Sequence, residues 1–261
     1  MHGALFVAKT GLSAQDTSLQ VISNNLANVS TVGFKQDRAV FEDLLYQVRR
    51  QPGAQSAAES QLPSGLQVGS GVKTVGTQKL FTNGDLEITD QAFDVAINGR
   101  GFMQVAMPNG EIGYTRNGQL HLNGNSEVVT AEGYLLEPAI TLPAEVETFT
   151  VANDGTVSVV VAGSADSVEI GQIELADFVN PAGLQAIGQN LFMETASSGA
   201  PIINNPGTGG TGVMQQGVLE TSNVNAVNEL VSMITTQRAY EMNSKVISTA
   251  DEMLSFVTQQ L

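Results

Sequence analysis

The side chains of this 261-residue chain that are able to carry out chemistry are few and poorly placed for it. There is no cysteine, and this removes disulfides, thiolate nucleophiles and cysteine-ligated zinc together. The only histidines are His2, near the N-terminus, and His121, in a predicted strand. No G-x-S-x-G motif accompanies them, so surface positions are favoured over a catalytic triad or a metal site. We therefore predict no metal site.

Two glycine-rich stretches match nucleotide-binding loops in spacing alone. Residues Gly207–Gly212, GTGGTG, fit G-x-G-x-x-G, but a proline-containing loop precedes them and VMQQGV follows where a helix would be needed. Residues Gly71–Gly76, GVKTVG, lack the Lys-Ser/Thr pair that ends a phosphate loop. We predict a linker at the first stretch, an arm at the second, and no cofactor.

Carboxylates are abundant, with 26 Asp/Glu against 11 Lys/Arg and a formal net charge of −15. Residues 81–220 alone hold seventeen acidic and two basic side chains. A glycosidase needs two carboxylates at a defined separation, and no spacing singles out a pair, so a solvated acidic surface is preferred. An enzyme acting on carbohydrate or peptidoglycan remains the alternative. The sequence contains no cluster of Lys and Arg with interleaved aromatic residues, so we expect no nucleic-acid partner.

The strongest patterns lie at the two ends of the chain. Leu5, Leu12, Leu19 and Leu26 recur every seven residues and predict one amphipathic helix over residues 3–28. Residues 224–260 contain no proline or glycine and predict a second, longer helix. Its broad apolar face includes Val227, Leu230, Val231, Ile234, Met242, Val246, Met253 and Phe256. A second stripe, nearly opposite, comprises Met233, Tyr240, Ile247, Leu254 and Leu261.

A helix that is apolar on two sides must be covered on two sides. One partner helix covers one side, and the second apolar side indicates contact with a neighbouring subunit. The ordinary alternative is a helix pair that packs on the β domain of the same chain. A heterologous contact between subunits propagates into a ring or a helical filament. Because lone amphipathic helices are marginal in water, both termini are expected to be largely disordered in the free monomer and to order on assembly.

The middle of the chain follows a different pattern. Short alternating runs such as FDVAI and FMQVA are separated by turn pairs that supply positive φ to hairpins, which predicts an antiparallel β domain. The turn pairs are Asn83-Gly84, Asn98-Gly99, Asn109-Gly110, Asn117-Gly118, Asn123-Gly124 and Asp154-Gly155.

These elements predict an α+β fold. Its terminal helices, in residues 1–34 and 222–261, are expected to pair as a coiled-coil-like core domain, with an inserted antiparallel β domain at 81–196. Residues 35–80 are expected to form an extended arm. Residues 197–221 begin with a stretch too rich in Gly, Pro and Asn for regular structure, and are expected to be a connector. The longest apolar run, near Val157–Ala162, is far too short to cross a membrane, so no membrane insertion is expected.

Residues 21–35, VISNNLANVSTVGFK, place poor helix formers in a helical pattern. We interpret Asn24 and Asn25 as polar residues that set the register between packed subunits. Asn28 either joins them or ends the helix, with Gly33 as the turn and Phe34 as the anchor of the arm. In that arm, Tyr46, Arg49, Arg50, Pro52 and Pro63 are expected to brace neighbouring subunits and stiffen the assembly.

These segments also resemble a known family. ISNNLANVSTVGFK resembles the N-terminal signature of the bacterial flagellar rod and hook axial proteins, and ETSNVNAVNELVSMITTQRAYEMNSKVISTADEML is similar to their C-terminal signature. AVFEDLLYQVRRQPGAQ followed by LPSGLQVGSGV resembles the arm of the distal-rod members in particular. INGRGFMQV and YTRNGQL in the β domain fit as well.

The resemblance implies a non-enzymatic subunit, exported unfolded through the flagellar type III apparatus, that polymerises into the distal rod. It implies a place in the periplasm-spanning rod of the basal body, the rigid drive shaft that transmits torque from motor to hook. The implied partners are further copies in a helical filament, proximal rod proteins, hook or hook-junction proteins and the outer bushing rings. A proximal-rod or hook subunit, distinguished by the arm, and a monomeric adhesin-like module are the rivals.

Overall fold

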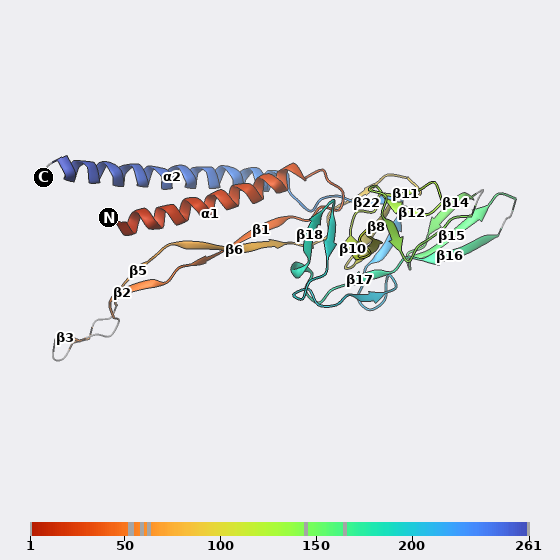
Figure 1. Cartoon of the computed structure of the whole chain (residues 1–261), viewed down its shortest axis with the longest axis horizontal. Coiled ribbons are helices and arrows are strands. Elements are labelled where there is room, and N and C mark those ends of the chain that lie inside the picture. The colour runs from red at the N-terminus through yellow and green to blue at the C-terminus, as the bar shows by residue number, and fades with distance from the viewer. Residues whose placement is uncertain are drawn as a thin grey trace. The chain divides into compact units, whose positions relative to one another are not determined.

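The structure is a computed structural model and describes residues 2–51, 55–57, 60–61, 64–143, 146–163 and 166–259. It is an α+β fold with helices near both ends of the chain and antiparallel strands between them (Figure 1). The chain divides into two compact units. The first comprises residues 1–27, 37–78 and 225–261, and the second comprises residues 28–36 and 79–224.

The first unit contains two long helices that pack along each other, α1 (His2–Ala27) and α2 (Ala226–Gln259) (Figure 1). Asn225 caps α2, because its Oδ1 accepts hydrogen bonds from the backbone N–H groups of Val227 and Asn228, each at 3.1 Å. A Cβ atom added at Gly11 of α1 would lie 3.1 Å from Asn243 Nδ2 of α2. The glycine therefore lets the two helices approach closely.

The rest of the first unit is a ribbon of paired strands. The strands are β1 (Asp37–Asp43), β2 (Tyr46–Arg50), β3 (Gln55–Ala57), β4 (Ser60–Gln61), β5 (Leu66–Gly69) and β6 (Val72–Lys79). β1 pairs with β6, β2 with β5 and β3 with β4, each as a two-stranded sheet. Extended backbone was expected here, but no sequence pattern indicated that the two halves of the segment pair with each other.

The second unit is built on a nine-stranded sheet ordered β11-β12-β13-β9-β10-β19-β18, with β17 pairing both β9 and β20. Its strands are β9 (Phe102–Ala106), β10 (Ile112–Thr115), β11 (Leu120–Leu122), β12 (Val128–Thr130), β13 (Leu135–Glu137), β17 (Leu175–Asp177), β18 (Gln185–Gly188), β19 (Leu191–Met193) and β20 (Ile202–Asn204), with a 3₁₀ turn η1 (Pro181–Gly183) before β18. β9 pairs with β10 along one side, and along the other side with β17 and then β13.

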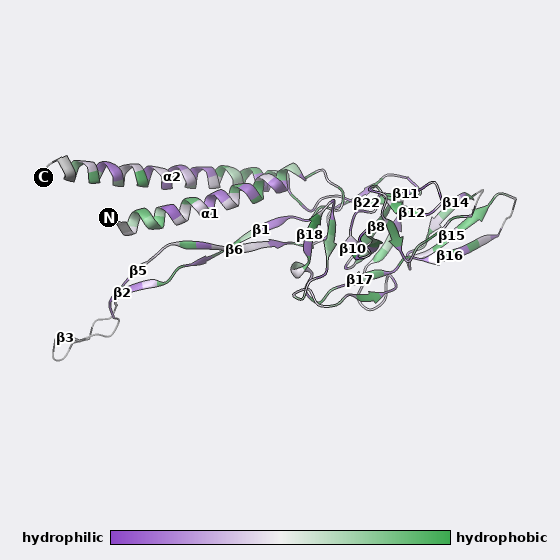
Figure 2. Cartoon of the chain, in the orientation of Figure 1, coloured by the Kyte–Doolittle hydropathy of each residue, from purple (hydrophilic) through white to green (hydrophobic). Residues whose placement is uncertain are grey.

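Smaller sheets complete this unit. They are β14 (Val146–Val151) with β15 (Thr156–Val161) and β16 (Ser167–Gln172), β7 (Leu86–Ile88) with β22 (Val218–Glu220), and β8 (Val95–Asn98) with β21 (Val213–Gln216). Figure 2 colours many residues in the strands of this unit as hydrophobic. The fully buried apolar side chains of the unit include Met103, Val105 and Leu175. A separate aromatic cluster surrounds Phe102.

The turn chemistry was partly as predicted. Gly99, Gly110 and Gly155 adopt positive φ, as turns between strands require. Gly118 does not adopt positive φ. A glycine is needed there because a Cβ atom would collide with the backbone carbonyl of Val95. The segment expected to lack regular structure contains β20, and its GTGGTG loop closes on itself through a 2.8 Å bond from Gly207 N–H to the Gly212 carbonyl. β21 follows the loop, whereas a dinucleotide loop precedes a helix.

Candidate functional site

The terminal helices bury small residues more completely than large ones. Ala8 and Ala14 of α1 and Ala250 of α2 are 5%, 7% and 6% exposed. The leucines of the α1 stripe, Leu5, Leu12, Leu19 and Leu26, are each only half-buried. Met233, Ile247 and Leu254 of α2 are also half-buried, Tyr240 is 42% exposed, and Leu261 lies outside the described residues. Much apolar area on both helices therefore remains in contact with water.

The broad apolar face of α2 is exposed in this single chain. Its members are Val227 at 68%, Leu230 at 46%, Val231 at 56%, Ile234 at 53%, Met242 at 64%, Val246 at 47%, Met253 at 57% and Phe256 at 62%. They recur at helical spacing along most of the helix length. A contiguous exposed apolar surface of this kind marks an interaction site rather than scattered surface hydrophobics.

The asparagines near the end of α1 lie in different environments. Asn25 is 1% exposed and forms a two-way clasp with β1, donating to the Asp37 carbonyl at 2.8 Å and accepting from the Asp37 N–H at 2.9 Å. Asn24 is exposed. Asn28 accepts a 3.2 Å hydrogen bond from the Thr31 hydroxyl. Asn25 thus has an intramolecular role that sequence patterns did not reveal.

Gly33 and Phe34 form a tight turn within the second unit. Gly33 has φ of 69°, and a Cβ there would lie 2.8 Å from the Arg116 backbone, so only glycine fits. Its N–H donates to the Glu220 carbonyl at 2.8 Å. Phe34 is buried, and the Lys79 ammonium lies 5.1 Å from its ring centroid.

A buried charge cluster follows this turn, and no pattern in the sequence indicated it. Lys35 Nζ donates to Glu220 Oε1 at 2.7 Å, and Arg116 Nη1 donates to Glu220 Oε2 at 3.1 Å. The three side chains are between 0% and 2% exposed. Lys35 Nζ also donates to the Thr82 carbonyl at 2.8 Å, and the Gly84 N–H donates to Glu220 Oε1 at 2.9 Å.

The electrostatics of this cluster are unbalanced, with two cations on one carboxylate. The pKa of Lys35 is lowered from the usual 10.5 to about 8, first by burial and then by the charge of Arg116, while Glu220 opposes the shift. Arg116 Nη2 donates to the Gly99 carbonyl at 2.5 Å, while its Nε is buried without a hydrogen-bond partner among the described residues. The cluster suits structural cross-linking of distant segments.

Asn223 adds a second cross-link beside the charge cluster. Its Oδ1 accepts from the Gln36 N–H at 2.7 Å, and its Nδ2 donates to the Leu80 carbonyl at 2.8 Å. The amide therefore ties the segment after Phe34 to the segment after β6. Together, Asn223 and the Lys35–Arg116–Glu220 cluster join four parts of the chain that are far apart in sequence, near residues 35, 82, 116 and 220.

The predicted arm residues lie on exposed strands. Tyr46, Arg49 and Arg50 belong to β2, every residue of which is exposed, and β2 pairs with β5 in register Tyr46–Gly69 and Val48–Gln67. Pro52 and Pro63 lie outside the described residues. Whether the arm braces a neighbouring copy stays a prediction.

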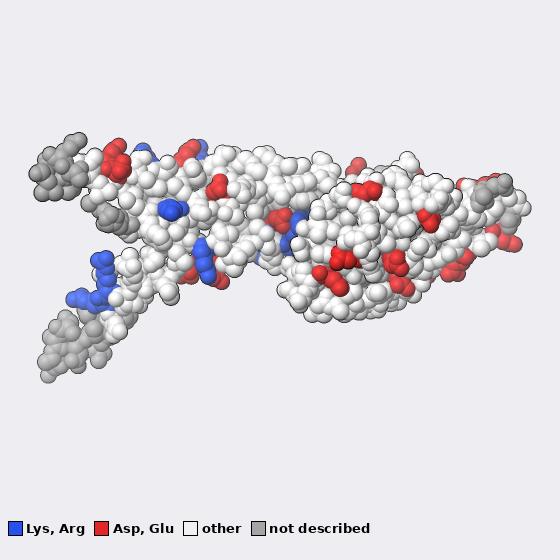
Figure 3. All heavy atoms as spheres, viewed as in Figure 1, with Lys and Arg blue, Asp and Glu red and all other residues white. Residues whose placement is uncertain are grey.

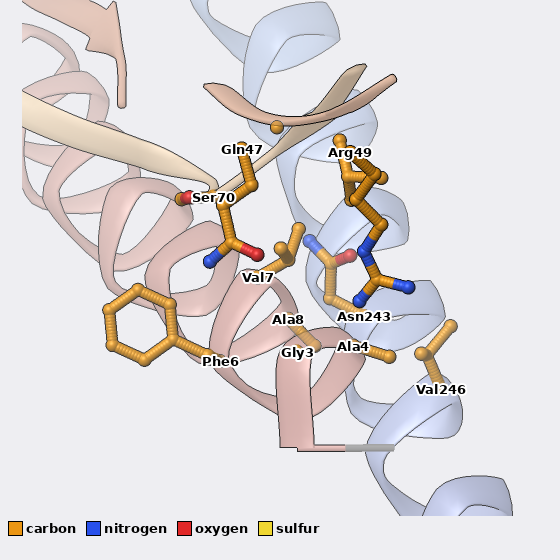
Figure 4. Close-up of a pocket in the computed structure, with 12 residues that line it drawn as sticks. Gly3, Ala4, Phe6, Val7, Ala8, Gln47, Arg49, Ser70, Asn243 and Val246 are labelled. Atoms are coloured by element: carbon orange, nitrogen blue, oxygen red, sulfur yellow. The ribbon is translucent and has the colours of Figure 1, made fainter. Parts of the chain in front are cut away.

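A groove of about 720 Å³ opens in the first unit between α1, the β2–β5 ribbon and α2 (Figure 4). Phe6 and Val7 of α1 form part of its wall, and Arg49 of β2 and Asn243 of α2 lie near each other in the close-up. Phe6 is 53% exposed and Val68 of β5 is 44% exposed. The groove is mostly apolar, with one guanidinium on its wall.

Within the part of the chain that the structure describes, no three His, Asp or Glu side chains gather as a metal site would require. His121 lies exposed on β11. Neither described helix combines the length and apolar character needed to cross a membrane.

Comparison with known proteins decides the family. Residues 5–35 match the family model "Flagella basal body rod protein", residues 96–159 match "Flagellar hook protein FlgE/F/G D1 domain", and residues 215–260 match "Flagellar basal body rod FlgEFG protein C-terminal". The chain is 53% identical to flagellar basal-body rod protein FlgG of Buchnera aphidicola subsp. Acyrthosiphon pisum, over 99% of this chain and 100% of that protein.

The chain belongs to the flagellar basal-body rod protein family. The same name is carried by relatives in Caulobacter vibrioides, 47% identical over 98% of both chains, and in Bacillus subtilis, 36% identical over 97% of both. As a member of this family, the chain is a structural rod component of the flagellar basal body.

The three matched segments of this rod protein contain the features described above. The first contains the leucine stripe, Asn25 and Lys35, the second contains Arg116, and the third contains Glu220 and α2. Residues 46–63 of the arm fall between the first and second matched segments.

Proposed function

We propose that this rod protein polymerises into a helical filament that forms the distal rod of the flagellum, the rigid drive shaft transmitting torque from motor to hook. The observation that carries the proposal is the exposed apolar face of α2, from Val227 to Phe256. α1 packs along α2 and leaves this face in water. Burying each such side chain against a neighbouring copy contributes about 1.5–3 kcal/mol before ordering entropy is subtracted.

The subunits pack through a coiled-coil-like core made by both terminal helices. The nine stripe residues, Leu5, Leu12, Leu19, Leu26, Met233, Tyr240, Ile247, Leu254 and Leu261, are assigned to this packing. Half-burial of the four α1 leucines in the single chain supports the assignment, because apolar area is left for a neighbour to cover.

The domain organisation that we propose keeps the boundaries derived from the sequence. Residues 1–34 and 222–261 form the helical core domain, 35–80 the arm, 81–196 the inserted β domain and 197–221 the connector. The ribbon formed by β1–β6 supports the assignment of an arm, because few apolar residues on it are buried.

Register between neighbouring copies is assigned to Asn24, whose exposed amide is placed to meet another copy. Asn25 contributes indirectly, by holding the end of α1 to β1. Asn28, Gly33 and Phe34 form the turn that leads out of the helix.

Stiffness is assigned to the arm, through Tyr46, Arg49, Arg50, Pro52 and Pro63. An extended ribbon that reaches a neighbour adds contacts at large radius, where bending strain is greatest. The exposed side chains of β2 support this role.

The proposed partners are proximal rod proteins at one end, hook or hook-junction proteins at the other, and the outer bushing rings around the rod. Export of the unfolded chain through the type III apparatus suits a sequence without cysteine, which forms no disulfide. The chain is proposed to have no enzymatic activity, and incubation with peptidoglycan should release no sugars.

The polymerisation proposal is tested with the purified full-length chain over a range of concentrations. The sedimentation coefficient and the helical signal in far-ultraviolet circular dichroism should increase together as the protein concentration rises, because the helices bury their exposed apolar faces on assembly. A chain that stays monomeric at every concentration, or that is fully helical when dilute with its leucines already protected from water, contradicts the proposal.

A further inference from the structure

The groove between α1, the β2–β5 ribbon and α2 carries a positive charge on a mostly apolar lining, which also includes the polar side chains of Gln47, Ser70 and Asn243. Phe6, Val7, Val68 and Val246 are between 39% and 53% exposed around it, and Arg49 lies on its ribbon wall. Arg50 is next to Arg49 on the same exposed strand, and neither guanidinium has an ion-pair partner among the described residues. Basic side chains stand out on this part of the ribbon in Figure 3. An occupant should therefore combine large apolar side chains with carboxylates.

One described segment of the chain has this combination. Residues 251–256 of α2 expose two adjacent carboxylates, Asp251 and Glu252, followed directly by the exposed Met253 and about one turn later by the exposed Phe256. Acidic side chains are visible near the C-terminal end of α2 in Figure 3. In a helix, residues three or four positions apart lie on the same side, so Glu252 and Phe256 face one partner together.

The segment is unable to enter the groove of its own chain. Val246 of α2 already lines the groove, and α2 continues without a break through Gln259. A helix rises about 1.5 Å per residue, so Phe256 lies about 15 Å beyond Val246 along the axis. The segment can therefore enter such a groove only on another copy.

We infer that the groove beside Arg49 receives the segment Asp251–Phe256 of a second copy of this chain, with Met253 and Phe256 as apolar anchors and Glu252 facing Arg49. The groove and the segment are different surfaces of one molecule, so the contact is heterologous and each copy binds the next. The inference rests on the proposed polymerisation and names two of the surfaces that meet in it.

Single-cysteine variants test the contact, because the natural chain contains no cysteine. Arg49→Cys and Glu252→Cys are made as separate full-length chains at exposed positions, mixed, polymerised and oxidised. A disulfide-linked dimer should form in the polymerised mixture and should be absent from either variant alone. Polymer without this dimer, or equal cross-linking in the dilute unpolymerised mixture, overturns the inference.

Glu241→Cys is the matched control, since it replaces another exposed glutamate about 16 Å away along α2. If Glu241→Cys cross-links to Arg49→Cys as efficiently as Glu252→Cys does, the inference is overturned. Dimers of Arg49→Cys alone would show that the ribbon of a second copy occupies the groove instead. If the unmodified chain forms no polymer at all, the proposed function itself fails, a result distinct from a polymer that does not cross-link.

Charge exchange provides an independent measurement. Arg49→Glu and Glu252→Arg should each raise the critical concentration for polymerisation by about three- to tenfold. The double variant Arg49→Glu/Glu252→Arg should return most of the way to the unmodified value. A double variant whose defect is the sum of the two single defects contradicts a direct contact.

Discussion

At the residue scale, Glu220 connects several segments of the second unit through hydrogen bonds. It accepts hydrogen bonds from Lys35, Arg116 and the Gly84 N–H, and its backbone carbonyl accepts from Gly33. A buried carboxylate is tolerated only when its lone pairs are satisfied in this way. Glu220 therefore joins segments that lie far apart in the sequence into one buried junction.

Glu220→Gln should destabilise the second unit by about 3–5 kcal/mol, because it leaves two buried cations without their counter-charge. Urea unfolding followed by circular dichroism measures the change. Lys73→Ala, which removes an ion pair whose side chains are 55% and 57% exposed, is the control and should cost at most about 1 kcal/mol. Equal effects of the two variants would show that the buried cluster has no special role.

The lowered pKa of Lys35 predicts a stability that rises with pH. Between pH 8 and 10.5 the folded chain has released the Lys35 proton while the unfolded chain still holds it, so the unfolded state binds more protons. The free energy of unfolding, relative to the variant Lys35→Met, should therefore increase across this window by up to roughly 3 kcal/mol. A flat or falling difference contradicts the burial of a charged lysine.

The asparagine pair predicts a defect of assembly. Asn24→Leu with Asn25→Leu should assemble promiscuously or in the wrong register, because apolar residues lack the directional hydrogen bonds that select one alignment. Asn24→Leu alone separates this effect from folding, since it leaves the Asn25–Asp37 clasp in place. Electron micrographs supply the measurement, and normal straight assemblies from the double variant would refute the register role.

At the element scale, the two terminal helices divide their apolar surface between two uses. Alanines and Gly11 allow α1 and α2 to approach closely, while the larger leucines stay half-buried and α2 keeps an exposed face. If the leucines were fully buried between the two helices, little apolar surface would remain for a neighbouring copy to cover. The choice of residue size thus links local packing to assembly.

The ribbon is the element that depends most on its surroundings. Its sheets have only two strands each, and such hairpins are marginal in water by themselves. Thr10 of α1 supports the ribbon, because its hydroxyl accepts a hydrogen bond from the Val72 N–H at 3.3 Å. Contacts with neighbouring copies would supply further support.

Deletion of residues 46–63 should give a softer, curved filament, because the assembly loses its contacts at large radius. Curvature and persistence length in electron micrographs measure the effect. The packed helices α1 and α2 and the buried core of the second unit lie outside the deleted residues, so the deletion variant should still polymerise. Straight polymers from this variant would count against the bracing role.

At the scale of the whole molecule, charge is distributed unevenly between the two units. Residues 28–36 and 79–224 contain seventeen Asp/Glu and four Lys/Arg, and two of the four, Lys35 and Arg116, are buried. Figure 3 shows acidic side chains spread over the visible face of this unit. Such surfaces repel one another, so we expect contacts between copies to form at the nearly neutral first unit.

Leu19→Asp should abolish polymerisation while the second unit stays folded. The substitution places a charge in the apolar stripe of α1, whereas the second unit has a separate core around Met103 and Leu175. Sedimentation reports the polymer and circular dichroism reports the strands. Filaments formed by this variant would contradict assembly driven by the helices.

The sequence by itself determined the type of each region and the family. Heptad leucines, a long segment without proline or glycine, and repeated Asn-Gly turns were enough for two terminal helices and an antiparallel β region. These signals are local, because periodicity and turn chemistry act over a few residues. The positions of the turns between β9 and β10 and between β14 and β15 followed from the same rule.

Only the tertiary structure decided which residues meet. Lys35, Arg116 and Glu220 are separated by about a hundred residues each, and no periodic pattern connects them. The Asn25–Asp37 clasp, the pairing of β2 with β5 and the burial of alanines in preference to leucines were also invisible in the sequence. All of these depend on the path of the chain through space, because a hydrogen bond or a packed contact is specified by both partners together.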